Sequence, residues 1–368
     1  MEIYLHIPFC RKKCLYCDFP SISGGNFLFE KYVRAVCREI ELRRCDEKIT
    51  SVYFGGGTPS ILPIDLIRKI FSTLGKNFEF DQNIETTIEI NPGTVDDNYL
   101  EQLRKIGFNR VSIGVQSFDD RLLKNLGRIH SSKTARDVVE SAKKFFKNIS
   151  VDLMYALPDE SLKNLADDLK IVTSLEIQHV SIYGLQIEEG TPFFEMNLNL
   201  PSEELSEQMY DLIMLELPRN NFHRYEISNF AKPGFESRHN LGYWSDVEYL
   251  GFGSSAHSYL KNDRFENISN VEEYINAVES GKIYQYSEDS SRTQNDLISE
   301  FCFLSLRKVA GINRKQFENK FGIPIESIFR KQIDRLIRKQ LLIADSDSIR
   351  LTDLGFKFGN LAFEEFLL

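Results

Sequence analysis

Cysteine, tryptophan and long apolar segments are all scarce in this sequence. Of its 6 cysteines, three lie far apart and show no pairing pattern, so they are expected to be small buried or surface thiols: Cys37, Cys45 and Cys302. No apolar run reaches the roughly 18 residues that predict a membrane-spanning helix. The N-terminus has no basic segment followed by an apolar one, so no signal peptide is predicted. These absences predict a cytoplasmic protein, in which thiols stay reduced.

The balance of charge is acidic. The 45 Lys and Arg residues are outnumbered by 54 Asp and Glu residues, which gives a formal net charge of −9. The electrostatic field of a protein with this negative charge repels nucleic acid, so no nucleic-acid partner is expected unless a local basic patch exists. The hydrophobic and charged fractions, 42% and 27%, are typical of a globular protein. A length of 368 residues accommodates two or three domains.

Three cysteines form a group that begins ten residues into the chain. Cys10, Cys14 and Cys17 have the spacing C-x3-C-x2-C, which places three thiolates within eight residues. A closed structural zinc site takes four ligands, and so does an ordinary ferredoxin-type cluster. A [4Fe–4S] cluster held by three thiolates keeps one iron open. That open iron is where a radical S-adenosylmethionine (SAM) enzyme binds the amino and carboxylate groups of SAM.

Half of a zinc site and a chance grouping of buried thiols are the two other interpretations of these cysteines. The motif follows a short apolar segment, 3–7, and has the aromatic neighbours Phe9, Tyr16 and Phe19. Aromatic side chains shield a cluster from solvent and tune its potential. An iron–sulfur cluster is therefore the favoured interpretation.

A repeated alternation of β-rich and helical segments runs through the first half of the chain. Strands are predicted at 3–7, 52–54, 84–90, 110–115, 149–154 and 179–183. Helices are predicted between them at 28–44, 63–74, 97–106, 120–126 with 132–146, and 161–175. Such alternation favours parallel strands joined by right-handed crossovers. Six units predict an α/β fold built on a partial (β/α)6 barrel, with an open doubly wound sheet as the alternative.

Polar residues or glycines follow each predicted strand at its carboxyl end. These segments are 10–17, 55–59, 89–92, 114–117, 152–158 and 184–186. Barrel enzymes place their sites at this end, whereas the strand interiors are nearly all apolar. Packing alone does not explain polar groups in this phase, so a cofactor cup is predicted there.

Each of these groups has a chemical use and a structural alternative. The glycines 55–57 let the backbone approach a ligand, or they form a tight turn. Glu89 and Asp152 can accept hydrogen bonds from SAM, or they cap a strand end. Gln116 can donate and accept at once, which suits a ribose or an adenine edge. Arg128 suits a carboxylate partner, or it is an ordinary surface arginine.

Over essentially the whole chain, the sequence resembles the oxygen-independent coproporphyrinogen III oxidase-like family of radical SAM proteins, and within it the HemW-type haem chaperones. The matching runs are LHIPFC at 5–10, FGGGTPS at 54–60, EINP at 89–92, VSIGVQSF at 111–118, LGR at 126–128, VDLMY at 151–155, YEISNFAKPG at 225–234 and RHNLGYW at 238–244. The resemblance implies a [4Fe–4S] cluster held by Cys10, Cys14 and Cys17. It implies SAM contacts from Tyr4, Tyr16, Gly56, Gly57, Thr58, Glu89, Gln116, Arg128 and Asp152.

The family contains coproporphyrinogen III dehydrogenases as well as haem chaperones, and several features separate them. The dehydrogenases have a fourth cysteine two positions beyond the third, where this chain has Phe19. They also carry an N-terminal extension, which is expected to be absent here because Cys10 follows only nine residues. The chaperones carry H-N-x-x-Y-W, present at 239–244. A haem chaperone is therefore more strongly implied than a decarboxylating enzyme, which stays the alternative; radical modification of RNA is disfavoured by the negative charge.

The H-N-x-x-Y-W motif has residue types that suit haem. His239 can ligate haem iron, while Tyr243 and Trp244 can cover an apolar porphyrin face. The alternative is that His239 is a turn residue and Trp244, the only tryptophan, a core anchor. His257 is a weaker candidate ligand. The expected partners are haem and an acceptor protein, and the acceptor can be a membrane protein at which the chain docks peripherally.

The last part of the chain predicts a small separate domain. Helices are expected at 297–306, 314–321 and 325–340, and strands at 342–344 and 349–351, as in a winged helix. The third helix alternates apolar and basic residues, which would suit DNA, but solvation or docking to a partner is favoured in so acidic a chain. The predicted domains are a radical SAM core over 1–230, an extension with H-N-x-x-Y-W over 231–288 and a winged-helix-like domain over 289–368.

Overall fold

Six parallel strands form the centre of the sheet in the computed structural model, which describes residues 1–283, 285–287 and 292–368. The strands are β1 (Glu2–Ile7), β4 (Ile49–Gly56), β5 (Phe80–Ile90), β6 (Arg110–Gln116), β7 (Ile149–Tyr155) and β8 (His179–Gly184). They lie side by side in this order, and each pairs in parallel with the next. The six predicted strands and their parallel arrangement are confirmed.

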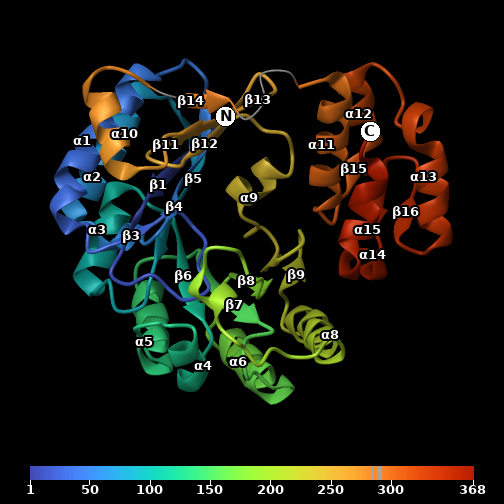
Figure 1. Cartoon of the computed structure of the whole chain (residues 1–368), viewed down its shortest axis with the longest axis horizontal. Helices are drawn as coiled ribbons and strands as arrows, with labels where there is room; N and C mark the ends of the chain where they lie inside the picture. Colours follow the sequence, from blue (N-terminus) through green and yellow to red (C-terminus); the bar gives the residue numbers. More distant parts are fainter. Residues whose placement is uncertain (284, 288–291) are drawn as a thin grey trace.

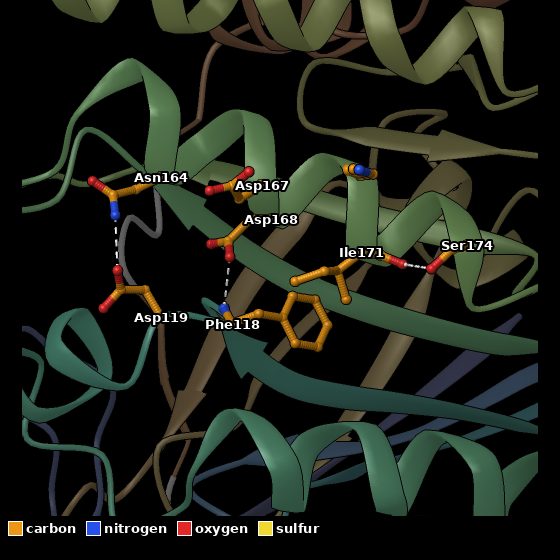
Figure 2. Close-up of a pocket in the computed structure, with 8 residues that line it drawn as sticks. Phe118, Asp119, Asn164, Asp167, Asp168, Ile171 and Ser174 are labelled. Atoms are coloured by element: carbon orange, nitrogen blue, oxygen red, sulfur yellow. Dashed lines mark hydrogen bonds between the residues drawn. The ribbon is translucent and has the colours of Figure 1, made fainter.

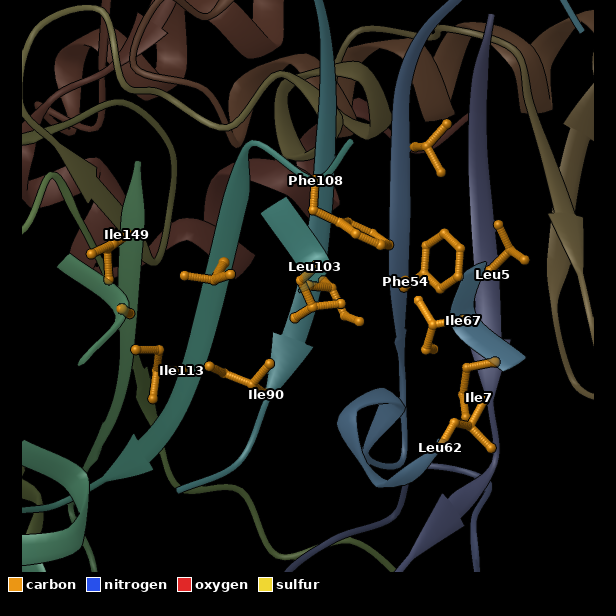
Figure 3. Packing of buried hydrophobic residues seen from close by; sticks show 14 of the residues in the cluster. Leu5, Ile7, Phe54, Leu62, Ile67, Ile90, Leu103, Phe108, Ile113 and Ile149 are labelled. Carbon is orange, nitrogen blue, oxygen red and sulfur yellow. The ribbon is translucent and has the colours of Figure 1, made fainter. Parts of the chain in front are cut away.

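Helices cover the outer face of this sheet (Figure 1). They are α1 (Phe29–Leu42), α2 (Ile64–Asn77), α3 (Asp97–Ile106), α4 (Asp120–Asn125), α5 (Ser132–Lys143) and α6 (Leu162–Ser174), as predicted. Figure 3 shows how strand residues such as Phe54 meet helix residues such as Ile67 and Leu103, which are all fully buried. Burial of each such side chain contributes about 1.5–3 kcal/mol, so this layer fixes the strands whose ends form the site.

The sheet does not close into a complete barrel. Beyond β8 it continues antiparallel with β10 (Asn229–Ala231) and β9 (His223–Arg224), while beyond β1 it continues parallel with β11 (Tyr249–Phe252). Next to β11 follow β12 (His257–Leu260), β13 (Asp263–Asn267) and β14 (Gln285–Ser287). The partial barrel is therefore confirmed, and part of the predicted extension at 231–288 continues the core sheet. The boundary predicted after residue 288 lies outside the described residues.

The other elements that precede residue 284 lie between or after these strands. They are β2 (Phe9–Cys10), β3 (Ile22–Ser23), η1 (Asn26–Leu28), η2 (Pro59–Ile61), α7 (Pro192–Glu195), α8 (Glu203–Arg219), α9 (Arg238–Tyr243) and α10 (Val271–Glu279). Helix α9 carries most of the H-N-x-x-Y-W motif and lies between the sheet and the C-terminal helices (Figure 1). Across the described ranges, no helix has the length and apolarity needed to cross a membrane.

The C-terminal region has a hydrophobic core of its own. Its elements are α11 (Gln294–Leu306), β15 (Ile312–Asn313), α12 (Arg314–Phe321), α13 (Glu326–Arg338), β16 (Leu342–Ala344), β17 (Ser348–Leu351), α14 (Asp353–Lys357), α15 (Gly359–Phe363) and η3 (Glu364–Phe366). Phe301, Phe317, Phe329 and Phe366 are buried together in this core. The three predicted helices and two predicted strands are confirmed, and β15 pairs with β17 as an additional strand.

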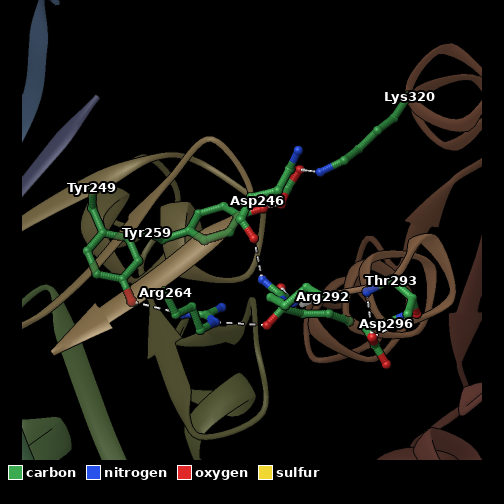
Figure 4. A network of polar contacts seen from close by, with 10 residues as sticks. Asp246, Tyr249, Tyr259, Arg264, Arg292, Thr293, Asp296 and Lys320 are labelled. Carbon is green, nitrogen blue, oxygen red and sulfur yellow. Dashed lines mark hydrogen bonds and ion pairs between the residues drawn. The ribbon is translucent and has the colours of Figure 1, made fainter. Parts of the chain in front are cut away.

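Polar contacts connect this region to the strands beside β1 (Figure 4). Glu300 on α11 accepts from Arg264 Nε on β13 at 2.9 Å and from Arg292 at 2.6 Å. Lys320 on α12 pairs with Asp246, which lies between α9 and β11. These contacts place the C-terminal region next to the H-N-x-x-Y-W helix.

Candidate functional site

A cavity of about 1220 Å³ lies at the carboxyl ends of the six parallel strands and extends to α9 and the C-terminal region. Most of the predicted site residues line it, whereas Tyr4, His239 and the weaker candidate His257 do not. The lining residues among those predicted are Cys10, Cys14, Tyr16, Cys17, Gly56, Gly57, Thr58, Glu89, Gln116, Arg128, Asp152, Tyr243 and Trp244. Because the carboxyl ends of neighbouring parallel strands meet at one edge, residues far apart in the sequence come together here.

The three cysteines of the N-terminal motif lie on the loop after β1. Cys10 is buried at the end of β2, whereas Cys14 and Cys17 are half-buried, and all three thiols are free. The loop is held by the Leu15 N–H, which donates to the Leu126 carbonyl oxygen at 3.1 Å. Within the described residues, no three His, Cys, Asp or Glu side chains are grouped to hold a single metal ion. Three free thiols on one wall of one cavity fit an iron–sulfur cluster, whose ligands bind separate iron atoms.

Glycines allow the loop and strand β4 to approach each other. A Cβ atom on Gly57 would lie 2.8 Å from the carbonyl oxygen of Phe9 and 3.0 Å from Cys10 Sγ. Gly56 has a φ of 110°, and a Cβ there would lie 2.7 Å from the ring of His6. Larger residues therefore do not fit beside the cysteine loop, which explains the glycine run at the end of β4.

Two carboxylates, those of Glu89 and Asp152, line the inner wall of the cavity. Glu89 accepts a hydrogen bond from the Tyr53 hydroxyl at 2.8 Å, and burial raises the pKa of Glu89 to about 7. Asp152 accepts from the Ser112 hydroxyl at 3.0 Å, and burial raises the pKa of Asp152 as well. Both groups can accept hydrogen bonds from a ligand when ionised, and both donate when protonated.

Arg128 reaches across the cavity from the segment after α4. Its guanidinium donates to Asn91 Oδ1 at 2.9 Å and to the carbonyl oxygen of Gly114, and it lies 3.5 Å from Cys14 Sγ. Gln116 sits nearby at an irregularity in the pairing of β6 with β7 and has a φ of 72°. A residue other than glycine in this left-handed region is uncommon and often marks a functional site.

His239 is enclosed behind the cavity wall. Its Nδ1 is hydrogen-bonded to the Ser51 hydroxyl at 2.8 Å, and its Nε2 to the Tyr243 hydroxyl at 3.2 Å. Its ring stacks against Tyr53, with ring centres 5.0 Å apart. Burial, together with the charge of Arg110, lowers the pKa of His239 to about 3. The imidazole is therefore neutral, and both of its nitrogens are engaged by protein groups.

Tyr243 and Trp244 follow His239 and reach the cavity. The Trp244 indole N–H donates to Glu226 Oε2 at 2.9 Å. Tyr243 packs edge to face on Tyr249, with ring centres 4.7 Å apart. His257, the weaker candidate, is exposed at the start of β12 and does not line the cavity.

Several lining residues were not predicted as site residues. Arg110, at the start of β6, is 2% exposed, and its Nε has no hydrogen-bond partner among the described residues. The strands of a parallel sheet are buried on both faces and are nearly all apolar, so a charged residue within a predicted strand could have been recognised as a candidate site residue. Glu226 and Arg307 also line the cavity; Glu226 lies in the matching run at 225–234, whereas no local pattern marks Arg307.

A second, smaller cavity of about 480 Å³ lies between α6 and the segment after β6 (Figure 2). Asp168, on α6, accepts from the backbone N–H of Phe118 at 2.9 Å and from the Ser117 hydroxyl at 2.7 Å. Asp119 accepts from the Asn164 amide at 2.7 Å. These carboxylates are engaged in holding helix α6 to the sheet.

The sequence matches two known protein families and is similar to several known proteins. The radical SAM superfamily matches residues 4–172, and the HemN C-terminal domain matches residues 293–358. The sequence is 38% identical to heme chaperone HemW of Lactococcus lactis over 99% of this chain and 97% of that protein. It is 35% identical to heme chaperone HemW of Bacillus subtilis over 99% and 98% of the two chains.

A solved structure is also similar over the whole chain. Coproporphyrinogen III oxidase (HemN) from Escherichia coli, a radical SAM enzyme, matches with a TM-score of 0.85 at 22% identity. The match covers 100% of this chain and 89% of that one, and it establishes the shared fold. A radical SAM domain implies a [4Fe–4S] cluster and SAM as its cofactors.

Proposed function

Because the chain belongs to the heme chaperone HemW family of radical SAM proteins, we propose that it binds haem and transfers it to an acceptor protein in the cytoplasm or at a membrane. The observation that carries this proposal is the shared cavity of about 1220 Å³, which brings the cysteine loop and the Tyr243–Trp244 pair to one space. Pockets for one small ligand measure about 300–1,000 Å³, so this cavity is larger than a single small ligand requires.

The end of the cavity beside the cysteine loop is proposed as the cofactor site. Cys10, Cys14 and Cys17 would hold three irons of the cluster, which when bound supplies a redox centre with one open iron. The proposed SAM contacts are Tyr4, Tyr16, Gly56, Gly57, Thr58, Glu89, Gln116, Arg128 and Asp152. Arg128 supports this assignment, because its guanidinium joins the cysteine loop to β6 and can pair with a carboxylate.

The opposite end is proposed as the haem site. Tyr243 and Trp244 line it with aromatic rings, which suit the apolar face of a porphyrin. His239, which does not line the cavity, is hydrogen-bonded to the hydroxyl of Tyr243. Direct ligation of haem iron by His239 requires its ring to leave the Ser51 or Tyr243 hydroxyl and to turn into the cavity.

The division of the chain is part of the same proposal. A core at 1–230 would carry the cluster and SAM, the extension at 231–288 would carry H-N-x-x-Y-W, and the domain at 289–368 would close the haem end. Residues 356–361 of that last domain line the cavity, which supports its part in ligand binding.

The test is an anaerobic haem titration of the protein after cluster reconstitution, followed at the Soret band. Tyr243→Ala is compared with Tyr99→Ala, because Tyr99 is a half-buried tyrosine on α3 that does not line the cavity. The same samples, with SAM and a reductant, are assayed for decarboxylation of coproporphyrinogen III. A variant with Cys10, Cys14 and Cys17 replaced by Ala tests the assignment of the cluster through its visible absorbance.

We expect stoichiometric haem binding that weakens in Tyr243→Ala but not in Tyr99→Ala, without decarboxylation. Turnover of coproporphyrinogen III together with absent haem binding would reject the proposal and indicate a decarboxylating enzyme. Cluster absorbance that survives the triple cysteine replacement would reject the ligand assignment.

A further inference from the structure

The guanidinium of Arg307 contacts two aromatic rings beside the cavity. The residue directly follows α11, and its Cζ lies 5.0 Å from the ring centre of Trp244 and 5.3 Å from that of Phe363. An aromatic ring attracts a cation electrostatically, and such a contact leaves the guanidinium N–H groups able to donate hydrogen bonds to another group. Arg307 lines the cavity, so those donors border the proposed ligand space.

Among the residues that the structure describes, no carboxylate forms an ion pair with Arg307. Its Nε is buried without a hydrogen-bond acceptor, and the described residues provide no ion pair to its guanidinium. The carboxylate whose charge acts on it, Glu226, is instead bonded to the Trp244 indole N–H and to the Ser228 backbone N–H at 3.0 Å. A half-buried guanidinium with unused donors costs stability unless a ligand supplies an acceptor.

The cavity as a whole is suited to an anion. Seven basic residues line it against five acidic ones, although the chain has a net charge of −9. The basic residues are Arg11, Lys12, Lys13, Arg110, Arg128, Arg307 and Lys357, and the acidic residues are Asp18, Glu89, Asp152, Glu188 and Glu226. A positive surplus inside an acidic protein attracts a negatively charged ligand to this cavity.

We propose that Arg307 binds a carboxylate group of the ligand through a two-pronged hydrogen bond. The inference rests on the proposed function, in which the ligand is haem and the carboxylate is one of its propionates. The flat guanidinium matches a carboxylate in geometry, and its contact with the Trp244 ring holds it beside the cavity before the ligand arrives. Trp244 thereby connects the H-N-x-x-Y-W motif to ligand recognition through a residue of the C-terminal domain.

The test compares haem with haem dimethyl ester, in which both propionates are uncharged. Both ligands are titrated into the reconstituted protein in one detergent-containing buffer, with the Soret band as readout. The variants are Arg307→Gln, which keeps a polar side chain without charge, and Arg307→Lys, which keeps the charge but lacks the paired N–H donors of a guanidinium. The control is Arg335→Gln, because Arg335 is a half-exposed arginine of the same domain, paired with Glu365 outside the cavity.

We expect Arg307→Gln to lower haem affinity by about tenfold or more and to leave ester affinity within about twofold. Arg307→Lys should fall between Arg307→Gln and the wild type, and Arg335→Gln should match the wild type. An equal loss for haem and ester would show a packing role and overturn the inference, as would undiminished haem binding; the proposed function would stand in both cases. Failure of the wild type to bind either ligand would overturn the proposed function together with this inference.

Discussion

Replacement of Glu85 by Gln is expected to loosen the helix that carries H-N-x-x-Y-W. Glu85 lies on β5, is 7% exposed and accepts three hydrogen bonds from the start of α9. The donors are the Ser237 hydroxyl at 3.3 Å and the backbone N–H groups of Arg238 and His239, each at 3.2 Å. A carboxylate at this position also interacts favourably with the positive end of the helix dipole.

The expected loss is about 2 kcal/mol. Hydrogen bonds to a charged group contribute about 1.5–3 kcal/mol, and Gln retains one acceptor oxygen but presents an amide to the other donors. A loss of this size corresponds to an increase of about thirtyfold in the population with α9 detached, since 1.4 kcal/mol is a factor of ten. Haem affinity should fall with it, because Tyr243 and Trp244 lie at the end of this helix.

Trp244 makes the assay specific, because it is the only tryptophan in the chain. Acrylamide quenching of tryptophan emission reports on the surroundings of Trp244, and urea unfolding followed by the same emission reports on the stability of the region that holds it. The matched control is Asp119→Asn, which removes the carboxylate that caps α4. Asp119 accepts hydrogen bonds there from the backbone N–H groups of Arg121 and Leu122, at 2.8 and 3.2 Å. The reasoning is refuted if Glu85→Gln leaves the urea midpoint and the quenching of Trp244 unchanged, or if Asp119→Asn changes the quenching equally.

Three further results are expected. Arg128→Met should weaken SAM binding about tenfold or more in equilibrium dialysis of the reconstituted protein, because it removes the charged donors beside the cysteine loop; unchanged affinity would remove Arg128 from the SAM site. Gly57→Ala should lower stability by about 1–3 kcal/mol and reduce cluster occupancy, because its Cβ would meet the carbonyl oxygen of Phe9 at 2.8 Å, whereas Gly75→Ala has nothing within 4 Å and should be neutral or stabilising. Burial raises the pKa of Glu160 to about 8, so its contribution to stability is complete below pH about 4.5 and is lost as pH rises through about 8. Wild type should therefore lose about 2 kcal/mol more than Glu160→Gln between pH 6 and 8 in urea titrations, and parallel pH profiles would contradict that assignment.

Local patterns were sufficient to predict the barrel strands and much of the site. Each strand is a short β-rich run followed by polar residues, and parallel pairing brings those ends to one edge whatever the loops between them contain. Glu89, Gln116 and Asp152, predicted separately at the ends of three strands, consequently line one cavity. The strands of the segment 249–267 were not predicted, because their place beside β1 depends on pairing across most of the chain.

The cysteine loop, the six strands and the residue types of H-N-x-x-Y-W could all be read from the sequence, because they depend on spacing within a few residues. Which of those residues reach the cavity depends on long-range contacts that spacing does not reveal. His239 turns to Ser51 and Tyr53 on β4, and Glu85, 154 positions away, holds the start of its helix. Arg307 enters the same cavity from a domain with its own core. Such contacts depend on how elements that are distant in the sequence pack together. Burial and hydrogen bonding between them determine which side of α9 faces the sheet.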